Sequence, residues 1–143
     1  MAITTLNPYL FFNGNAAEAI KLYERALGAV TEAFQRYGEV GGAPDEQRKV
    51  PEEMQKRIIH ASLRVGDTRF MVSDTVNDTR PAEGNVDVVL QFDDPDDMKQ
   101  RFEALSAGGR VTLPLHDTFW NATFGALTDA HGIRWMFNYT KPG

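Results

Sequence analysis

The chain has 143 residues, no cysteine and a formal net charge of −5 at pH 7. The absence of cysteine excludes disulfides, thiolate nucleophiles and Cys-ligated zinc, and the negative charge disfavours nucleic acid as a partner. The sequence contains neither an apolar run long enough to cross a bilayer nor a signal-peptide pattern, so we expect a cytoplasmic protein.

The chain begins as a strand, a helix and a second strand. An aromatic strand is predicted over 6–12, and the Asn-Gly-Asn run after it offers a helix cap. Apolar residues then recur at helical spacing over 16–27, until Gly28 supplies a natural stop. A second strand is predicted over 29–37.

A long excursion and a hairpin follow. Residues 38–56 are rich in glycine, proline and charge, with a helical turn predicted near 51–54, and the segment suits a lid or a disordered insertion equally. Residues 57–74 alternate apolar and polar side chains on both sides of Gly66-Asp67, which predicts two strands joined by a turn. The polar face of this hairpin carries titratable and hydrogen-bonding groups, so we interpret it as the wall of a pocket.

The second half repeats this order of elements. Asp94 and Pro95 are predicted to be the cap and the first residue of a helix. Its apolar residues recur at helical spacing up to Leu105, and Gly108-Gly109 is predicted to end it. The remaining segments are predicted as strands over 86–92, 111–115, 119–128 and 133–139, the last two forming a hairpin.

Three matches indicate an internal duplication. Residues 26–31 and 107–112 share the pattern Ala-x-Gly-x-Val-Thr, and Arg-Phe-Met-Val at 69–72 matches Arg-Trp-Met-Phe at 134–137. The two predicted helices also align, after a gap of one residue. Because the matches occur in the same order, they predict two copies of one βαβββ unit.

This pattern resembles the vicinal oxygen chelate superfamily, which includes glyoxalase I, bleomycin-resistance proteins and extradiol dioxygenases. Within it, the chain looks most like the PhnB-like group, from Pro-Tyr-Leu-Phe-Phe-Asn-Gly at 8–14, Ile-His-Ala at 59–61, Phe119-Trp120 and Trp135-Met136. The resemblance implies an α+β fold within a single domain, 1–143, often assembled as a homodimer. Two tandem βαβββ modules, 6–74 and 86–139, would form a curved, cup-shaped mixed sheet with the helices outside.

The resemblance also assigns the two faces of each strand. The helix-facing positions should be apolar, namely Leu10, Phe12, Ile59, Ala61, Leu63, Phe70, Val72, Val88, Leu90, Phe92, Trp135, Phe137 and Tyr139. The opposite positions should face the cup, namely Asn7, Tyr9, Phe11, His60, Ser62, Arg64, Arg69, Met71, Ser73, Asp87, Val89, Gln91, Arg134, Met136 and Asn138. A mixed polar face suits a ligand cavity better than a second dry core.

Glyoxalase-type members hold a divalent metal with His or Glu from their first, fourth, fifth and eighth strands. Carried over to this chain, those positions fall near Asn7, on Met71, near Asp87 and on Met136. A thioether is a poor ligand for such a cation, and one carboxylate cannot hold it against water. We therefore expect neither a metal site nor another cofactor; a non-standard site that joins His60 to Asp74 or Asp87 is the alternative.

Each remaining candidate has two interpretations. His60 could act as an acid, a base or a hydrogen-bonding group, because imidazole titrates near neutrality. Alternatively, it is a buried histidine whose hydrogen bonds are made by a neighbouring strand. Arg64, Arg69 and Arg134 could bind an anion, or they pair with acidic side chains. The predicted ligand-binding residues are Tyr9, Phe11, Ser62, Arg64, Arg69, Met71, Asp87, Gln91, Phe119, Trp120, Arg134, Met136 and Asn138.

The aromatic candidates also allow packing roles. Phe119 and Trp120 could roof the pocket or pack in a dimer or a core, and Tyr9 and Phe11 could line the cup or serve packing alone. Asp74 and Asp129 are expected to end strands or cap turns.

Two functions are compatible with these observations. The first is a small-molecule-binding protein that sequesters a small polar or anionic ligand, as bleomycin-resistance proteins do. The second is a lyase or isomerase of the same superfamily, with His60 as the base and an arginine as an electrostatic clamp. The methyltransferase label that some PhnB-like proteins carry is not supported, because no Gly-rich cofactor loop follows a first strand.

Overall fold

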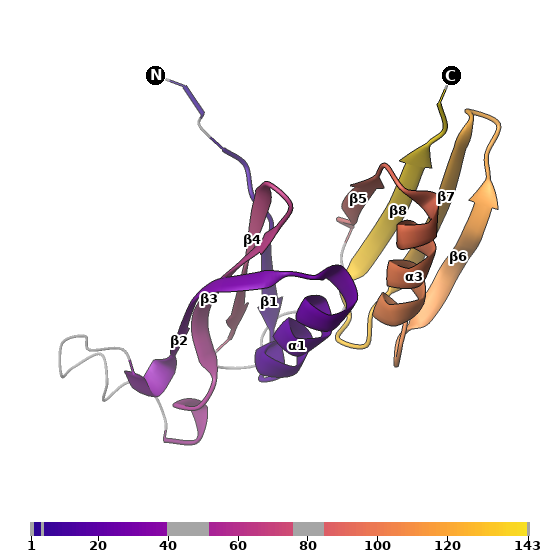
Figure 1. Cartoon of the computed structure of the whole chain (residues 1–143). Coiled ribbons are helices and arrows are strands. Elements are labelled where there is room, and N and C mark those ends of the chain that lie inside the picture. Colours follow the sequence, from indigo (N-terminus) through magenta and orange to yellow (C-terminus); the bar gives the residue numbers. More distant parts are fainter. Residues whose placement is uncertain (1, 4, 40–51, 76–84, 143) are drawn as a thin grey trace. The chain divides into compact units, whose positions relative to one another are not determined.

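The structure is a computed structural model that describes residues 2–3, 5–39, 52–75 and 85–142. The chain divides into two compact units, Met1–Arg80 and Pro81–Gly143, and each has its own sheet (Figure 1). Among the described helices, none is both long and apolar enough to cross a membrane.

The first unit contains a four-stranded mixed sheet in the order β1-β4-β3-β2. Its β1 and β4 run parallel, and the other pairs are antiparallel. Its elements are β1 (Tyr9–Phe12), α1 (Ala16–Leu27), β2 (Val30–Arg36), the 3-10 turns η1 (Tyr37–Glu39) and η2 (Glu52–Met54), β3 (Ile58–Val65) and β4 (Thr68–Asp74).

The second unit repeats this topology, with the strand order β5-β8-β7-β6 and the same pattern of parallel and antiparallel pairs. Its elements are β5 (Val88–Phe92), α3 (Pro95–Leu105), β6 (Arg110–Asp117), β7 (Ala122–Thr128) and β8 (Arg134–Thr140). The predicted α+β fold of two tandem βαβββ modules is confirmed.

The boundaries needed several corrections. Residues 119–121 form a turn rather than the start of a strand, and β6 continues through Pro114 to Asp117. Helix α3 ends at Leu105, three residues before the glycine pair, because Ser106 already caps it. Within the long excursion, η2 lies where the helical turn was predicted, whereas 40–51 lies outside the described residues, so the lid interpretation stays a prediction.

The core of each unit lies between its helix and one face of its sheet. In the first unit Tyr23 of α1 packs edge-on against Phe70 of β4, with ring centroids 5.8 Å apart. In the second, Phe137 of β8 stacks on Phe92 at 5.3 Å and meets Phe102 of α3 edge-on at 5.0 Å. Large aromatic side chains bury much apolar area, so these contacts hold each helix to its sheet.

The predicted helix-facing residues of the central strands are buried, except for Ile59 in β3 and Tyr139 in β8, which are half-buried. Ile58 is fully buried (0% exposed) whereas the predicted Ile59 is only half-buried. The pairing of β2 with β3 shifts register between Gln35 and Arg36, and Arg36 pairs with Ile58. Such an irregularity inserts a residue and turns the next side chain to the other face, which a simple alternation cannot anticipate. In the edge strand β5, the helix-facing residues are half-buried rather than buried.

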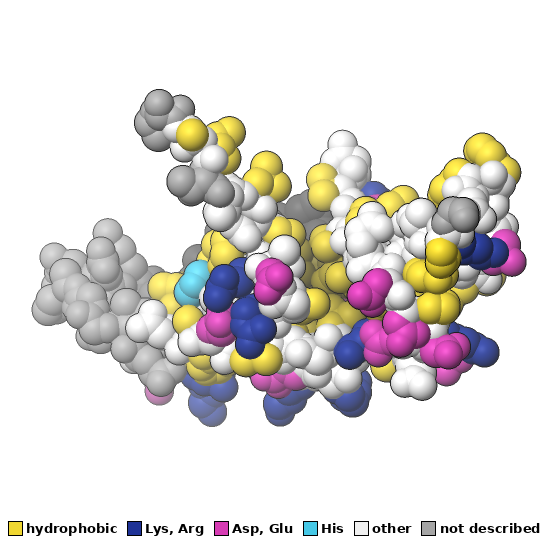
Figure 2. All heavy atoms as spheres, turned by 45° about the horizontal axis from the view of Figure 1, so that its top comes forward, with side chains coloured by type: hydrophobic (Ala, Val, Ile, Leu, Met, Phe, Trp, Pro, Cys, Tyr) yellow, Lys and Arg dark blue, Asp and Glu magenta, His cyan; other side chains and the backbone are white. Residues whose placement is uncertain are grey.

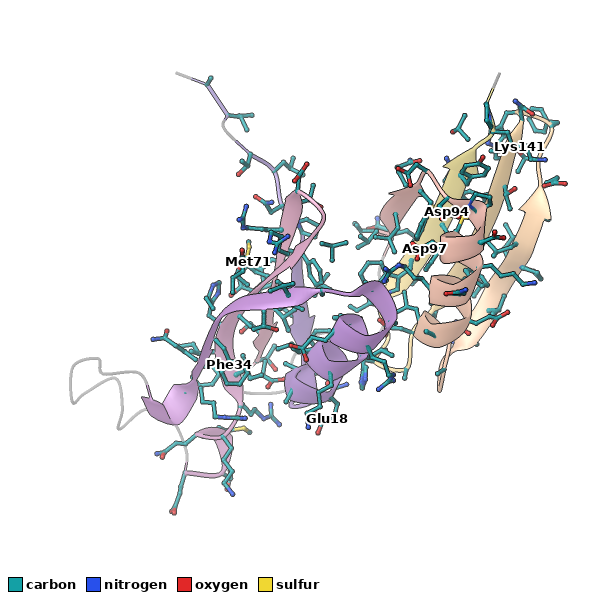
Figure 3. The ribbon with its side chains drawn as sticks, viewed as in Figure 1. Glu18, Phe34, Met71, Asp94, Asp97 and Lys141 are labelled. Atoms are coloured by element: carbon teal, nitrogen blue, oxygen red, sulfur yellow. The ribbon has the colours of Figure 1, made fainter. Side chains whose placement is uncertain are left out.

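The two helices are capped differently. Asp94 caps α3 as predicted, because its Oδ1 accepts hydrogen bonds from the backbone N–H groups of Asp96 and Asp97 at 2.9 and 3.2 Å (Figure 3). At the N-cap of α1, Asn15 from the predicted Asn-Gly-Asn run makes no side-chain capping bond. The buried Asp74 replaces it, accepting from the N–H groups of Gly14 and Ala16 at 2.8 and 3.0 Å. Its second oxygen accepts from Ile58 N at 3.0 Å, so this carboxylate joins three segments.

The strand pairing also refines the internal repeat. Met71 pairs with Tyr9 and Ser62, as Met136 pairs with Val89 and Ala126, so the two methionines are equivalent. The same register places Thr31 and Val111 opposite Leu63 and Leu127. The Val-Thr match between 26–31 and 107–112 is therefore offset by one residue in space.

Candidate functional site

Each sheet presents a second face, opposite its helix, on which the predicted cup residues lie. In the first unit one row across the strands is Tyr9, Met71, Ser62 and Ala33, and its counterpart in the second unit is Val89, Met136, Ala126 and Leu113. Both methionines are half-buried, between buried neighbours that face the helix (Figure 3 labels Met71). The thioethers thus occupy the middle of these faces rather than the helix-packed core.

An aromatic and imidazole cluster lies on the open face of the first unit. The Tyr9 and Phe11 rings stack, with centroids 4.6 Å apart and an interplanar angle of 10°. The Tyr9 hydroxyl lies 3.2 Å from His60 Nδ1, within hydrogen-bond distance, and the imidazole meets the Tyr9 ring at 69°. His60 is half-buried, and its Nδ1 has a partner on β1, on the far side of β4, while Tyr9 remains 39% exposed.

A charged cluster lies on the same unit, formed by Glu32, Arg64 and Arg69. Arg64 Nε and Arg69 Nε lie 3.2 and 2.6 Å from the two Glu32 carboxylate oxygens. The hydrogen bond from Arg69 is the main cause that lowers the pKa of Glu32, with Arg64 adding to it. Arg64 and Arg69 thus pair with an acidic side chain, which was one of the two predicted roles. Because two guanidinium groups share one carboxylate, the cluster keeps a net charge of +1.

Sequence reasoning missed Glu32. The pairing of β2 with β3 shifts register between Thr31 and Ala33, so Glu32 is the extra residue of a bulge. A bulge redirects a side chain, and here it brings the Glu32 carboxylate to the two arginines. Alternation alone gives no signal for this position.

The open face of the second unit carries two polar pairs. Arg134 Nε lies 2.5 Å from Asp87 Oδ1, and this ion pair is about 70% buried, with side-chain exposures of 31% and 26%. Asn138 Nδ2 donates to Gln91 Oε1 at 2.9 Å. The ion pair joins β8 to the residue before β5, and the amide pair joins β8 to β5 itself. All four residues were predicted to line the ligand site.

Phe119 and Trp120 occupy the turn between β6 and β7, where Asn121 adopts a positive φ of 62°. Phe119 is 96% exposed and Trp120 is 51% exposed. Trp120 contacts Phe124 of β7 edge-on at a centroid distance of 6.1 Å. This exposure rules out the core-packing interpretation for both rings within the chain itself.

The superfamily metal does not fit the residues at the equivalent positions. The first unit offers Asn7, whose Nδ2 donates to the Arg69 carbonyl at 2.9 Å, together with the thioether of Met71. The second unit offers Asp87, which is paired to Arg134, together with Met136. Within the described ranges no three His, Asp or Glu side chains are gathered as metal ligands. The alternative metal site with Asp74 is not supported either, because the Asp74 carboxylate accepts hydrogen bonds from backbone N–H groups.

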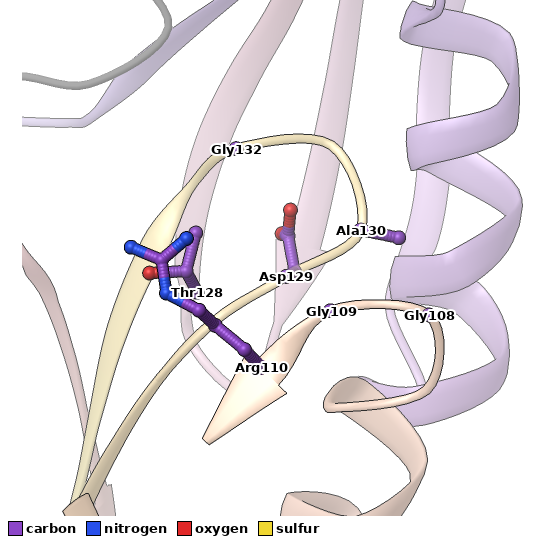
Figure 4. Close-up of a pocket in the computed structure, with 7 residues that line it drawn as sticks. All are labelled: Gly108, Gly109, Arg110, Thr128, Asp129, Ala130 and Gly132. Atoms are coloured by element: carbon purple, nitrogen blue, oxygen red, sulfur yellow. The ribbon is translucent and has the colours of Figure 1, made fainter. Parts of the chain in front are cut away.

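The structure also contains a hollow of about 390 Å³ that the sequence did not predict, formed by two turns of the second unit (Figure 4). Gly109 lies so close to the opposite turn that a Cβ there would sit 2.2 Å from the Thr128 carbonyl oxygen. Asp129, one of the residues that line the hollow, accepts from His131 N and from Trp135 Nε1, both at 2.8 Å, so it caps its turn as expected. The hollow is lined by Gly108, Gly109, Arg110, Thr128, Asp129, Ala130 and Gly132.

The surface of each unit mixes charge and apolar character. On the face shown in Figure 2, acidic, basic and hydrophobic side chains are all exposed, and acidic side chains lie beside the basic ones. This distribution agrees with the net charge of −5. It gives no support to a phosphate-backbone partner.

Comparisons with known proteins agree with this architecture. The chain is 34% identical to Protein YjdN of Escherichia coli (strain K12) over 140 residues, which is 95% of each chain. The crystal structure of protein PA1353 from Pseudomonas aeruginosa shares 35% identity and a TM-score of 0.82, covering 98% of this chain and 100% of that one. The PhnB protein of Bacillus cereus, also described as a candidate 3-demethylubiquinone-9 3-methyltransferase, shares 22% identity and a TM-score of 0.76, over 96% and 100%.

The family itself is shown by a match that spans nearly the whole chain. Residues 5–137 match the sequence pattern of the Glyoxalase/Bleomycin resistance protein/Dioxygenase superfamily. With two βαβββ modules in tandem, the chain belongs to that superfamily.

Proposed function

We propose that this protein binds a small polar or anionic molecule on the open faces of its sheets, without the superfamily metal. The observation that carries the proposal is the pair of equivalent methionines, Met71 and Met136, on faces otherwise lined by aromatic and hydrogen-bonding groups. A face of this kind offers a ligand both apolar area and directed polar contacts. Binding and sequestration need no Lewis acid.

The chemistry of the two faces narrows the ligand. The first unit offers the Tyr9–Phe11 stack and the residual positive charge of the Glu32 cluster. The second offers amide groups from Gln91 and Asn138. The first face therefore favours a ligand with an apolar or planar part and an anionic group, and the second favours a ligand with hydrogen-bonding groups. As further parts of the proposal, the protein is cytoplasmic and homodimeric, as superfamily members often are.

The proposal is tested by thermal unfolding in the presence of a panel of small metabolites. A ligand at about 100 times its Kd adds about 2.7 kcal/mol to the free energy of unfolding, which gives a clear upward shift of the midpoint. We expect carboxylated and aromatic members of the panel to raise the midpoint equally with and without a chelator. Shifts that vanish with the chelator would contradict metal-free binding.

A second candidate, a lyase or isomerase with His60 as base, is favoured by the exposed edge of the Tyr9–His60 pair. Once any turnover is found, His60→Ala should abolish it if His60 is the base. If His60 only binds, the same substitution should raise KM and leave kcat largely unchanged.

A further inference from the structure

We propose that Tyr9 is a positioning residue that holds His60 in the tautomer protonated on Nε2, so that His60 meets the ligand as a hydrogen-bond donor. The inference rests on the proposed function and narrows it: at this point the ligand presents an oxygen acceptor, such as a carboxylate or carbonyl, carried on an aromatic or apolar body. It also separates the two candidate functions, because a histidine held in this way is a binding group rather than a base.

The geometry fixes both partners of the contact. Tyr9 is held by its stack on Phe11, with centroids 4.6 Å apart, so its hydroxyl has a defined position. That hydroxyl lies 3.2 Å from Nδ1 of His60, and the two rings meet nearly edge to face at 69°. The contact joins β1 to β3 across β4, the strand that lies between them in the sheet.

The chemistry of the two groups decides the direction of the hydrogen bond. A phenol O–H is a stronger donor than a neutral imidazole N–H, and an imidazole lone pair is a stronger acceptor than a phenol oxygen. Tyr9 therefore donates and Nδ1 accepts. In neutral histidine one ring nitrogen carries the proton and the other accepts, so the proton is on Nε2.

The neighbouring hydroxyl groups are bound to the backbone, and that of Tyr37 donates to the Asp74 carbonyl oxygen at 2.9 Å. Ser73, on the strand between Tyr9 and His60, has its Oγ 2.9 Å from the Ile59 carbonyl oxygen, so its hydroxyl is committed to the backbone. Within the described ranges no carboxylate contacts His60, whereas catalytic bases are commonly oriented by an acid. Nε2–H is consequently the polar group that the imidazole offers to a ligand.

The tautomer is tested first, in the free protein. Long-range proton–nitrogen correlation NMR separates protonated from unprotonated ring nitrogens, and the His60 signals are identified among the three histidines by their loss in His60→Gln. Above the titration of the ring, we expect an unprotonated Nδ1 and a protonated Nε2 in the parent protein. Tyr9→Phe keeps the stacked ring but removes the hydroxyl, so the two tautomers should mix. Tyr139→Phe, the same change in the second unit, should leave the His60 signals unchanged.

Ligand chemistry is tested next with benzoate and benzylamine, which share a ring but differ in having an oxygen acceptor or an ammonium group. Benzoate should shift the Nε2 signal of His60 and benzylamine should not. A proton on Nδ1 of the parent protein, unchanged signals in Tyr9→Phe, or a shift of the Nε2 signal by benzylamine as large as that by benzoate would overturn the inference. If the proposed function itself fails, no member of the metabolite panel raises the thermal midpoint, yet the tautomer result is unaffected; the two failures are therefore distinguishable.

Discussion

The two units share one backbone plan but differ in the side chains on their open faces. Counting from the equivalent Met71 and Met136, Val89 takes the place of Tyr9, and Phe124 takes the place of His60. The first unit thus carries an imidazole and a phenol where the second is apolar. The duplication fixed strand order and register, while the chemistry of each face diverged separately.

The helix-facing sides show the same contrast in packing. Phe137 of the second unit occupies the position of Val72 in the first, and both are fully buried. The larger ring packs against Phe92 and Phe102, whereas in the first unit the aromatic contact between helix and sheet joins Tyr23 and Phe70. Each core was therefore filled by its own set of side chains.

The largest effect is expected from emptying one of these equivalent core positions. Phe137→Ala removes a fully buried ring that contacts two other aromatic rings, and it should lower the free energy of unfolding by about 3–5 kcal/mol. Val72→Ala removes less volume and should cost clearly less. Urea unfolding of both variants measures the difference, and equal losses of unfolding free energy would contradict this stabilising role of the Phe137 ring.

The next effect comes from Asp74, which has no acidic counterpart in the second unit, where Tyr139 occupies its position. Asp74→Ala leaves the part-buried N–H group of Gly14 and the buried N–H groups of Ala16 and Ile58 without their acceptor, and it should cost about 2–4 kcal/mol. Asp67→Ala, in the exposed turn of the same hairpin, is the matched control and should be nearly neutral. Equal midpoints for the two variants in urea unfolding would remove Asp74 from this role.

A smaller effect separates the polar pairs at equivalent positions. Asp87 and Arg134 form an ion pair, whereas their counterparts Asn7 and Arg69 are joined only through a backbone carbonyl. A double-mutant cycle with alanine at 87 and 134 should give a coupling energy of about 0.5–1 kcal/mol, because the pair is partly solvent-screened. The cycle at 7 and 69 should give less than this. A larger coupling in the first unit would reverse the comparison.

The smallest effect is a shift in the titration of Glu32, whose bulge position in the second unit is held by Thr112. Its pKa lies below the ordinary 4.5, chiefly through the hydrogen bond from Arg69, so its contribution to stability is present above 4.5 and is lost as the pH falls through the lower folded value. Carboxyl-carbon NMR should show Arg69→Met raising this pKa toward 4.5. An unchanged titration would mean that the ion pair does not persist in solution.

The sequence predicted the fold well because its signals are local and repeated. Strand alternation, the Asp94-Pro95 cap and the matched Arg-x-Met segments each report on nearby backbone, and they agreed on two βαβββ modules. The predictions failed where the position or role of a residue depends on a partner that is distant in the sequence. Asp74 caps a helix that begins 58 residues before it, and bulges displace Glu32 and Ile58 from the simple pattern.

The candidate site was predictable in composition but not in its pairings. Alternation placed His60, Arg64 and Met71 on one face, yet it could not show that Tyr9 reaches His60 or that one glutamate holds two arginines. Such contacts form between side chains on different strands, so they depend on which residues lie opposite each other. The sequence does not give that register; the folded sheet does.

With methionine at both equivalent positions, the open faces should hold no resident cation. Elemental analysis of protein purified from metal-replete medium, without chelators, tests it most directly. We predict far less than one equivalent of nickel, zinc, iron or manganese per chain. A stoichiometric amount of any of them, lost on replacing Asp87 by alanine, would contradict the account.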